Sequence, residues 1–119
     1  MGHVLIHNTR GTNDVERATL AFVVANTALA GGQEATVLLT LEGVRIGVEG
    51  CCDGLTAEGF PPLSDVINSF VSNGGNLWVC GACAKPRGIG QDDLLAGGTI
   101  VGAAAAVEAL VTGAQTLSF

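Results

Sequence analysis

The hydrophobic pattern of this 119-residue chain alternates between two periods. Short runs rich in valine, isoleucine and leucine, bounded by polar or glycine-rich turns, are typical of strands buried in a parallel sheet. His3 and His7 share one side of the first run with Leu5, and we interpret them as strand residues at the sheet's edge rather than ligands. Alternating residues 44–48 indicate either an extra edge strand or an extended loop. The other strands are predicted at residues 3–8, 36–41, 76–80 and 115–119.

Longer stretches between these runs have helical periodicity. Asn13 and Glu16 have the spacing of a capping box and precede a stretch that is apolar on nearly every side. From Leu63, apolar residues at i, i+3, i+4, i+7 and i+8 form an amphipathic stripe, and Thr99 is placed to cap a later alanine-rich stretch. The predicted helices cover residues 14–30, the stretch from Pro61 to Gly74, residues 91–96 and residues 100–111.

Alternation of strands and helices with short connections predicts an α/β fold, a three-layer α/β/α arrangement with a mainly parallel sheet of about five strands. The length suits a single domain spanning residues 1–119. Right-handed crossovers place the strand-to-helix loops at one edge of the sheet, where ligands of open α/β sheets bind. We expect that edge to collect Thr9, Arg10, Asn13, the segment 42–60 with Cys51 and Cys52, and the loop after Cys80.

The composition narrows the classes of function. A net charge of −6 argues against nucleic acid or an anionic membrane as a partner. Because only 13% of residues are charged and 48% are hydrophobic, we expect apolar surface to be buried in a homo-oligomer. A membrane span is not expected, since the longest weakly polar run, residues 94–111, contains Glu108 and several glycines. Four cysteines without a basic signal-peptide region indicate reduced, cytoplasmic thiols.

The most informative stretch is residues 77–88, where a predicted strand leads into a Cys-x-x-Cys motif formed by Cys80 and Cys83. Alone, this motif indicates a redox dithiol, half of a zinc site, or a reactive cysteine with a companion. Nearby cations favour the nucleophilic thiolate, and small residues let backbone N–H groups approach a sulfur. These supporting residues are Lys85, Arg87, Gly81 and Ala82.

Neighbouring residues weaken two of these interpretations. A thioredoxin-type motif opens a long helix, whereas Pro86 and Gly88 interrupt one here. A structural zinc site needs four ligands, but the remaining cysteines, Cys51 and Cys52, are adjacent. We therefore expect no bound metal and no cofactor.

Several segments resemble the DsrE/F-like sulfur-relay family, and together they cover nearly the whole chain. The segments are residues 79–89, 98–102, 116–119 and 41–44 and the Gly74-Gly75 pair. The resemblance implies a three-layer α/β/α fold that assembles as a trimer or hexamer. In its sulfur-carrying members, a cysteine at a strand end accepts sulfane sulfur as a persulfide. This cysteine matches Cys80, and Cys83 matches a second cysteine found in some branches.

Three functions follow as alternatives. The first is a sulfurtransferase-like sulfur carrier that accepts or transfers sulfane sulfur as a persulfide on Cys80. It uses Cys83 as a resolving or tuning thiol, and sulfur donor and acceptor proteins are its expected partners. The second is a non-catalytic oligomeric scaffold or small-ligand binding module of the same fold. The third is a metal site that adds one or both of Cys51 and Cys52 to the motif.

Overall fold

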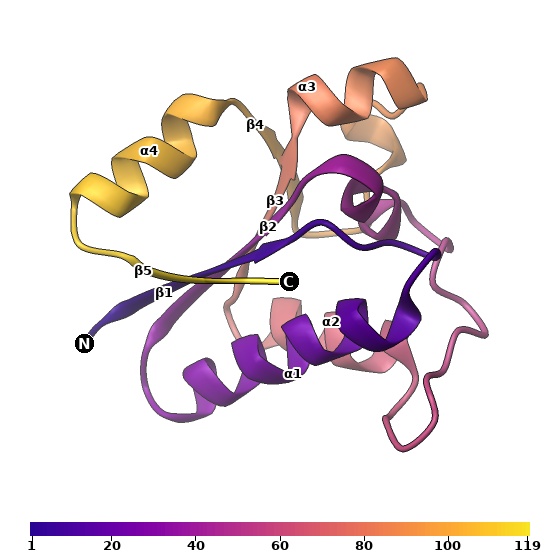
Figure 1. The fold of residues 1–119 in the computed structure, drawn as a ribbon, viewed down its shortest axis with the longest axis horizontal. Helices are drawn as coiled ribbons and strands as arrows, with labels where there is room; N and C mark the ends of the chain where they lie inside the picture. Colours follow the sequence, from indigo (N-terminus) through magenta and orange to yellow (C-terminus); the bar gives the residue numbers. More distant parts are fainter.

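The structure is a computed structural model that describes residues 1–119. One sheet of five parallel strands in the order β4-β3-β2-β1-β5 forms its centre (Figure 1). The strands are β1 (His3–Asn8), β2 (Glu34–Leu39), β3 (Asn76–Cys80), β4 (Gly98–Val101) and β5 (Gln115–Ser118). Two of the predicted strands, residues 3–8 and 76–80, are confirmed with their bounds; the second strand begins and ends two residues earlier than predicted.

Helices cover the two faces of this sheet unequally. In Figure 1, α1 and α2 lie together on one side of the sheet and α4 lies on the other, which confirms the three-layer α/β/α arrangement. Short α3 and 3₁₀ segments connect the remaining elements. The helices are α1 (Val15–Ala30), α2 (Leu63–Ser72), α3 (Gly81–Ala84) and α4 (Ala103–Val111), with 3₁₀ helices η1 (Leu41–Gly47), η2 (Lys85–Arg87) and η3 (Gln91–Asp93).

The hydrophobic core fills the space between the sheet and the α1–α2 layer. Phe22 of α1 and Phe70 of α2 are fully buried and pack edge to face, with ring centroids 5.6 Å apart. Such an aromatic pair contributes about 1 kcal/mol beyond the burial of its area. The apolar stripe predicted from Leu63 onward packs here. Its buried members are Leu63, Val66, Ile67 and Phe70.

The alanine-rich stretch begins differently from the prediction. Residues 98–101 form strand β4, and α4 starts only at Ala103. Thr99, Ile100 and Val101 are β-branched, which favours a strand, and they pair in register with β3. The strand that the sequence analysis did not predict is therefore β4. The helix predicted at residues 100–111 begins at Ala103 instead, because the residues before it belong to the sheet.

Residues 44–48 form neither an edge strand nor an extended loop. Val44 and Ile46 are both fully buried because η1 folds this segment onto the core. Only Val48 pairs, in an isolated antiparallel bridge with Leu94. Glycine permits the close packing, since a Cβ at Gly43 would lie 2.5 Å from the Asn8 carbonyl oxygen.

Three smaller predictions also need correction. The N-cap of α1 is Asp14 rather than Asn13, because the Asp14 carboxylate accepts from the Arg17 N–H at 3.1 Å. The short helix predicted at residues 91–96 is only the 3₁₀ turn η3. The histidine-bearing strand β1 lies between β2 and β5 and is not at the sheet's edge.

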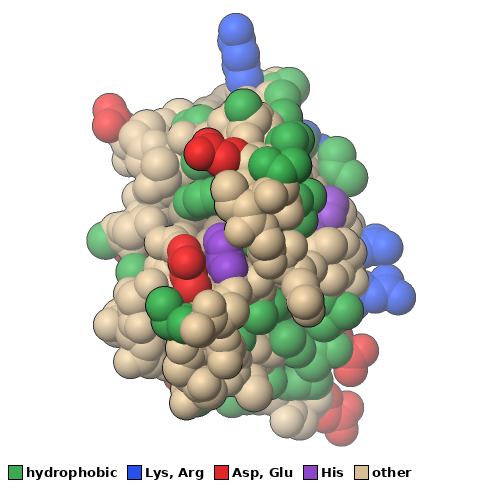
Figure 2. Space-filling model, turned by 90° about the vertical axis from the view of Figure 1, so that its left-hand side faces the viewer, with side chains coloured by type: hydrophobic (Ala, Val, Ile, Leu, Met, Phe, Trp, Pro, Cys, Tyr) green, Lys and Arg blue, Asp and Glu red, His purple; other side chains and the backbone are tan.

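The α4 side of the sheet is the less covered one. Figure 2 views the molecule from the left-hand side of Figure 1, with α4 above and α1 below, and shows exposed hydrophobic side chains in both parts and histidine beside acidic groups. The most exposed apolar residues of this side are Val107 (57%), Leu110 (42%) and Val111 (77%) of α4. No helix of the structure has the length and apolarity needed to cross a bilayer.

Candidate functional site

Cys80 is the last residue of β3, at the carboxyl edge of the sheet. Its strand neighbours Leu77 and Val79 are buried in the core, so alternation turns Cys80 toward the α4 side. The chain then enters α3, which carries Cys83 one turn later. Both thiols are free and half-buried. The sequence-predicted pair therefore lies at the position where open α/β sheets bind ligands.

An apolar cavity of about 220 Å³ lies directly beside Cys80. Strands β2 and β4 and the first turns of α4 form its walls. The lining residues are Leu38, Thr40, Cys80, Val101, Gly102, Ala103, Ala106 and Val107. No charged side chain is among them, and apart from the thiol the only polar side chain is the Thr40 hydroxyl.

The Thr40 hydroxyl already has a partner. Thr40 Oγ1 lies 2.7 Å from Nε2 of His7 on the neighbouring strand β1. An equivalent contact of 2.8 Å joins His3 Nε2 and Thr36 Oγ1 further from the edge. These cross-strand pairs satisfy polar groups on the thinly covered face, and the His7 pair places an imidazole next to the wall of the cavity.

A carboxylate clamp holds the loop that carries Cys83. Glu42 in η1 accepts hydrogen bonds from Arg45 Nε at 2.8 Å and from Arg87 Nε at 3.0 Å. Arg87 also donates from Nη1 to the Cys83 carbonyl oxygen at 3.0 Å. The hydrogen bonds from Arg87 and Arg45 hold the pKa of Glu42 below its ordinary value. Arg87 therefore ties η1 to the cysteine loop.

The remaining supporting residues of the loop are arranged around this clamp. Lys85 and Ala82 are exposed, and the hydrogen bonds of Arg87 go to oxygen acceptors rather than to a thiol. Gly81 packs closely on β4, where a Cβ would lie 3.1 Å from Ile100 Cγ2. Its small size lets the loop turn directly against the sheet.

Residues after β1 at the same edge make local structural contacts. Thr9 Oγ1 donates to the Phe119 carbonyl oxygen at 2.8 Å, and Asn13 Oδ1 accepts from the Gly11 N–H at 2.9 Å. Arg10 is half-buried and is held through its backbone by both ends of the Asn8 side-chain amide. These three predicted residues therefore build the turn that supports η1.

Cys51 and Cys52 are not brought to Cys80. Cys52 is buried, with Sγ directed to the Ile46 carbonyl oxygen at 3.5 Å. Burial raises the pKa of the Cys52 thiol to about 12, with smaller effects from Cys51 and Asp53. The thiol is therefore protonated at neutral pH, and its nucleophilic form is almost absent.

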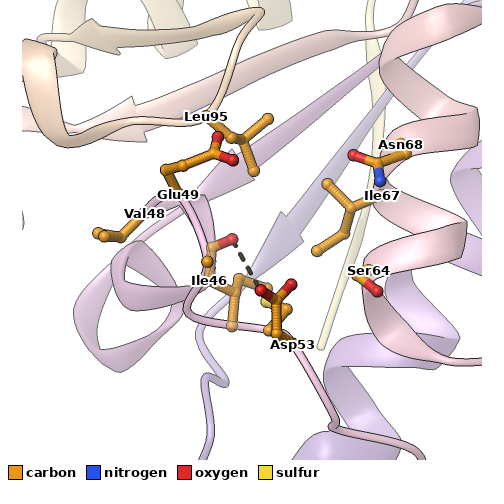
Figure 3. Close-up of a pocket in the computed structure, with 10 residues that line it drawn as sticks. Ile46, Val48, Glu49, Asp53, Ser64, Ile67, Asn68 and Leu95 are labelled. Atoms are coloured by element: carbon orange, nitrogen blue, oxygen red, sulfur yellow. Dashed lines mark hydrogen bonds between the residues drawn. The ribbon is translucent and has the colours of Figure 1, made fainter.

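A second, smaller cavity of about 70 Å³ adjoins Cys52. Figure 3 shows Ile46 and Asp53 on one side of it and Ile67 and Asn68 of α2 on the other. It shares no lining residue with the cavity at Cys80. No three His, Cys, Asp or Glu side chains gather closely enough to hold a metal ion. The four cysteines thus form two separate regions.

Several residues of the site were not singled out from the sequence. Glu42 carries a weak signal, because Arg45 stands three positions later in ion-pairing distance on a helical turn. Thr40 and the α4 residues Ala106 and Val107 carry none, since they meet Cys80 only through the sheet order and the path of α4.

The fold and the site together define a three-layer α/β/α protein with a cysteine at the carboxyl end of a central strand. The family model of the DsrE/DsrF-like family matches residues 2–119, so the chain belongs to this family, which is associated with sulfur relay.

Among sequence relatives, an uncharacterized protein of Methanocaldococcus jannaschii is 34% identical over 100 residues, which are 84% of this chain and 36% of that protein. An uncharacterized protein of Methanopyrus kandleri is 30% identical over 82 residues, 69% of this chain and 64% of that protein. The chain thus spans less than two thirds of either relative.

Solved structures agree in fold. The ychN protein of E. coli superposes with a TM-score of 0.82 at 16% identity, covering 100% of this chain and 99% of that one. A protein of unknown function from Methanobacterium thermoautotrophicum gives a TM-score of 0.79 at 18% identity, with both chains fully covered. These similarities support the three-layer architecture.

Proposed function

We propose that this protein carries sulfane sulfur as a persulfide on Cys80 and that Cys83 releases it. The observation that carries the proposal is the position of Cys80: a free, half-buried thiol at the carboxyl end of β3, beside a cavity. Cys52 offers no comparable site, because its thiol is buried and protonated. Membership of a family associated with sulfur relay supports this choice.

The proposed transfer is an exchange without net oxidation. The Cys80 thiolate attacks the outer sulfur of a donor R–S–SH, the donor's S–S bond breaks, and R–S⁻ takes up the proton that Cys80 lost. The product is Cys80–S–SH and R–SH. Attack of Cys83 on the inner sulfur then gives a Cys80–Cys83 disulfide and releases hydrosulfide, so the sulfane sulfur is reduced as the two thiols are oxidised.

Intact mass spectrometry after incubation with a sulfane-sulfur donor tests this function. Wild-type protein should gain about 32 Da, one sulfur atom, and Cys80→Ser should lose that adduct. Cys83→Ser should keep the adduct for longer, and Cys51→Ser serves as a control without effect. Loss of the adduct in Cys83→Ser alone would reverse the two roles. Its persistence in Cys80→Ser would remove Cys80 from the reaction.

We also propose that the chain works as a homo-oligomer, a trimer or hexamer by its resemblance to the family. Support comes from Leu110 (42% exposed) and Val111 (77% exposed), apolar residues in the last turn of α4 that do not line the cavity at Cys80. Isolated exposed apolar residues are ordinary, but residues gathered on one side of a molecule mark an interaction surface.

A further inference from the structure

The walls of the cavity beside Cys80 are chemically uniform. Five of its lining side chains are aliphatic, supplied by β2, β4 and α4: Leu38, Val101, Ala103, Ala106 and Val107. The Thr40 hydroxyl, its one polar side chain besides the thiol, already pairs with His7. A ligand in this open cavity therefore meets mainly methyl and methylene groups where it touches the wall, apart from the sulfur.

Positive charge is absent from the cavity as well. The chain has only five lysines and arginines, and none lines this space. Arg45 and Arg87 are paired with Glu42, and Arg17 is paired with Asp14. An anionic donor would lose hydration in this cavity without gaining a countercharge, which is a costly transfer.

The volume suits a small hydrocarbon group. An apolar cavity of about 150 Å³ can hold a benzene molecule. The cavity at Cys80, at about 220 Å³, has room for a group of that size together with the sulfur atoms of a donor.

We infer that this cavity binds the R group of the sulfur donor, so that the preferred donor is a persulfide, R–S–SH, whose R group is an uncharged alkyl chain, rather than a persulfide with a charged R group or thiosulfate. The inference rests on the proposed persulfide function and specifies its substrate class. The alkyl group occupies the space between Ala106 and Leu38, and the outer sulfur meets Cys80. The released R–SH leaves as a neutral thiol.

A pair of donors with the same shape separates charge from size. In the Cys83→Ser background, which retains the first adduct, 3-methylbutyl hydropersulfide should load Cys80 about tenfold faster than 2-carboxyethyl hydropersulfide. Equal rates, or faster loading by the carboxylate, would overturn the inference and leave the proposed function intact. No loading by either donor, or by inorganic polysulfide, would count against the function itself.

Two alanine substitutions on α4 give a matched control. Ala106→Leu fills the cavity and should remove most of the preference for the alkyl donor, whereas Ala104→Leu changes an exposed position of the same helix and should leave it unchanged. Circular dichroism and the unfolding midpoint of both variants establish that they fold. An unchanged preference in folded Ala106→Leu would place the selecting surface elsewhere.

A readout without persulfide chemistry tests the cavity alone. Neutral propyl methanethiosulfonate and its sulfonated analogue both transfer R–S to Cys80 and release methanesulfinate, forming a mixed disulfide. The neutral reagent should react about tenfold faster at Cys80 than the anionic one, relative to their rates with the unfolded chain. Slower reaction of both reagents with rising protein concentration would mean that a second copy of the chain fills the cavity, which would also overturn the inference.

Discussion

The two faces of the sheet each hold a cysteine beside a cavity, and they differ in how they are covered. On one face, α1 and α2 supply 16 and 10 residues of helix, and Cys52 is sealed in the core beside about 70 Å³ of space. On the other, α4 supplies 9 residues, and Cys80 stays half-exposed beside about 220 Å³.

This difference separates stability from reactivity. The face covered by α1 and α2 contains the fully buried aromatic pair of Phe22 and Phe70. Burial on this face also keeps the Cys52 thiol protonated. The thinly covered face carries polar histidine–threonine pairs, an accessible thiol and exposed apolar residues. A sheet with one face of each kind can hold a reactive cysteine on a rigid strand without weakening its core.

The largest expected contrast is in thiol reactivity. Raising the pKa of Cys52 from 9.0 to about 12 lowers its thiolate fraction about a thousandfold at mildly alkaline pH. Iodoacetamide should therefore modify native Cys52 about a thousandfold more slowly than Cys52 in the urea-unfolded chain, measured by peptide mass spectrometry. Its half-buried neighbour Cys51 is the internal control. Comparable rates at Cys52 in the two states would show that this face opens readily.

The second largest contrast between the two faces is expected in self-association. Leu110 on α4 and Leu20 on α1 are the same residue type with similar exposure, 42% and 37%. Leu110→Asp should weaken self-association about tenfold or more, because it places a charge in the proposed interface. Leu20→Asp should have no such effect. Sedimentation of the wild type as a monomer near 11.9 kDa, or dissociation by Leu20→Asp alone, would contradict the assignment.

The smallest expected effect concerns the clamp at the edge. Arg87 and Arg45 both pair with Glu42, but only Arg87 reaches the Cys83 carbonyl. Arg87→Met should speed amide hydrogen exchange in the loop around Cys83 about three- to fivefold, and Arg45→Met should change it less. Equal effects would mean that the contact with Cys83 adds nothing.

The contribution of the Glu42 pairs to this protection should depend on pH. The pKa of Glu42 is lowered in the folded state, so its pairs stabilise the fold above the ordinary value of 4.5 and are lost as pH falls through the lower folded value. The difference between wild type and Arg87→Met should therefore be largest at neutral pH and shrink in strong acid to the part supplied by the hydrogen bond from Arg87 to the Cys83 carbonyl. A difference that does not shrink in strong acid would show that the pair with Glu42 contributes nothing.

Much of the fold could be predicted because its strands are continuous apolar runs. The runs at residues 3–8 and 76–80 have no competing helical period, and the stripe from Leu63 has no competing strand period. The predicted start of α4 was wrong because three β-branched residues from Thr99 onward, which favour a strand, directly precede the alanine-rich sequence. Residues 44–48 alternate like a strand, yet Val44 and Ile46 are buried by a 3₁₀ turn that depends on the contact of Gly43 with β1.

The site was predictable only in part. Local sequence identifies Cys80 and Cys83, since the strand and the motif are contiguous. The cavity depends on α4 crossing the sheet, and the clamp joins positions 42 and 87, so neither has a local signal. Topology alone grouped Cys51 and Cys52 with Cys80, but the chain after η1 turns Cys52 into the core and leaves Cys51 half-buried beside it.

The pairing of β5 with β1 has a consequence for how the chain folds during synthesis. Thr9 and Phe119 are joined by a hydrogen bond across 110 positions, so this side of the sheet closes only after residue 119 has emerged. The α1–α2 core can form earlier from β1, β2 and β3. Because α4 is anchored by β4 and β5, its apolar surface takes shape after the α1–α2 core, and chains that have not yet extended to β5 lack the surface proposed for association.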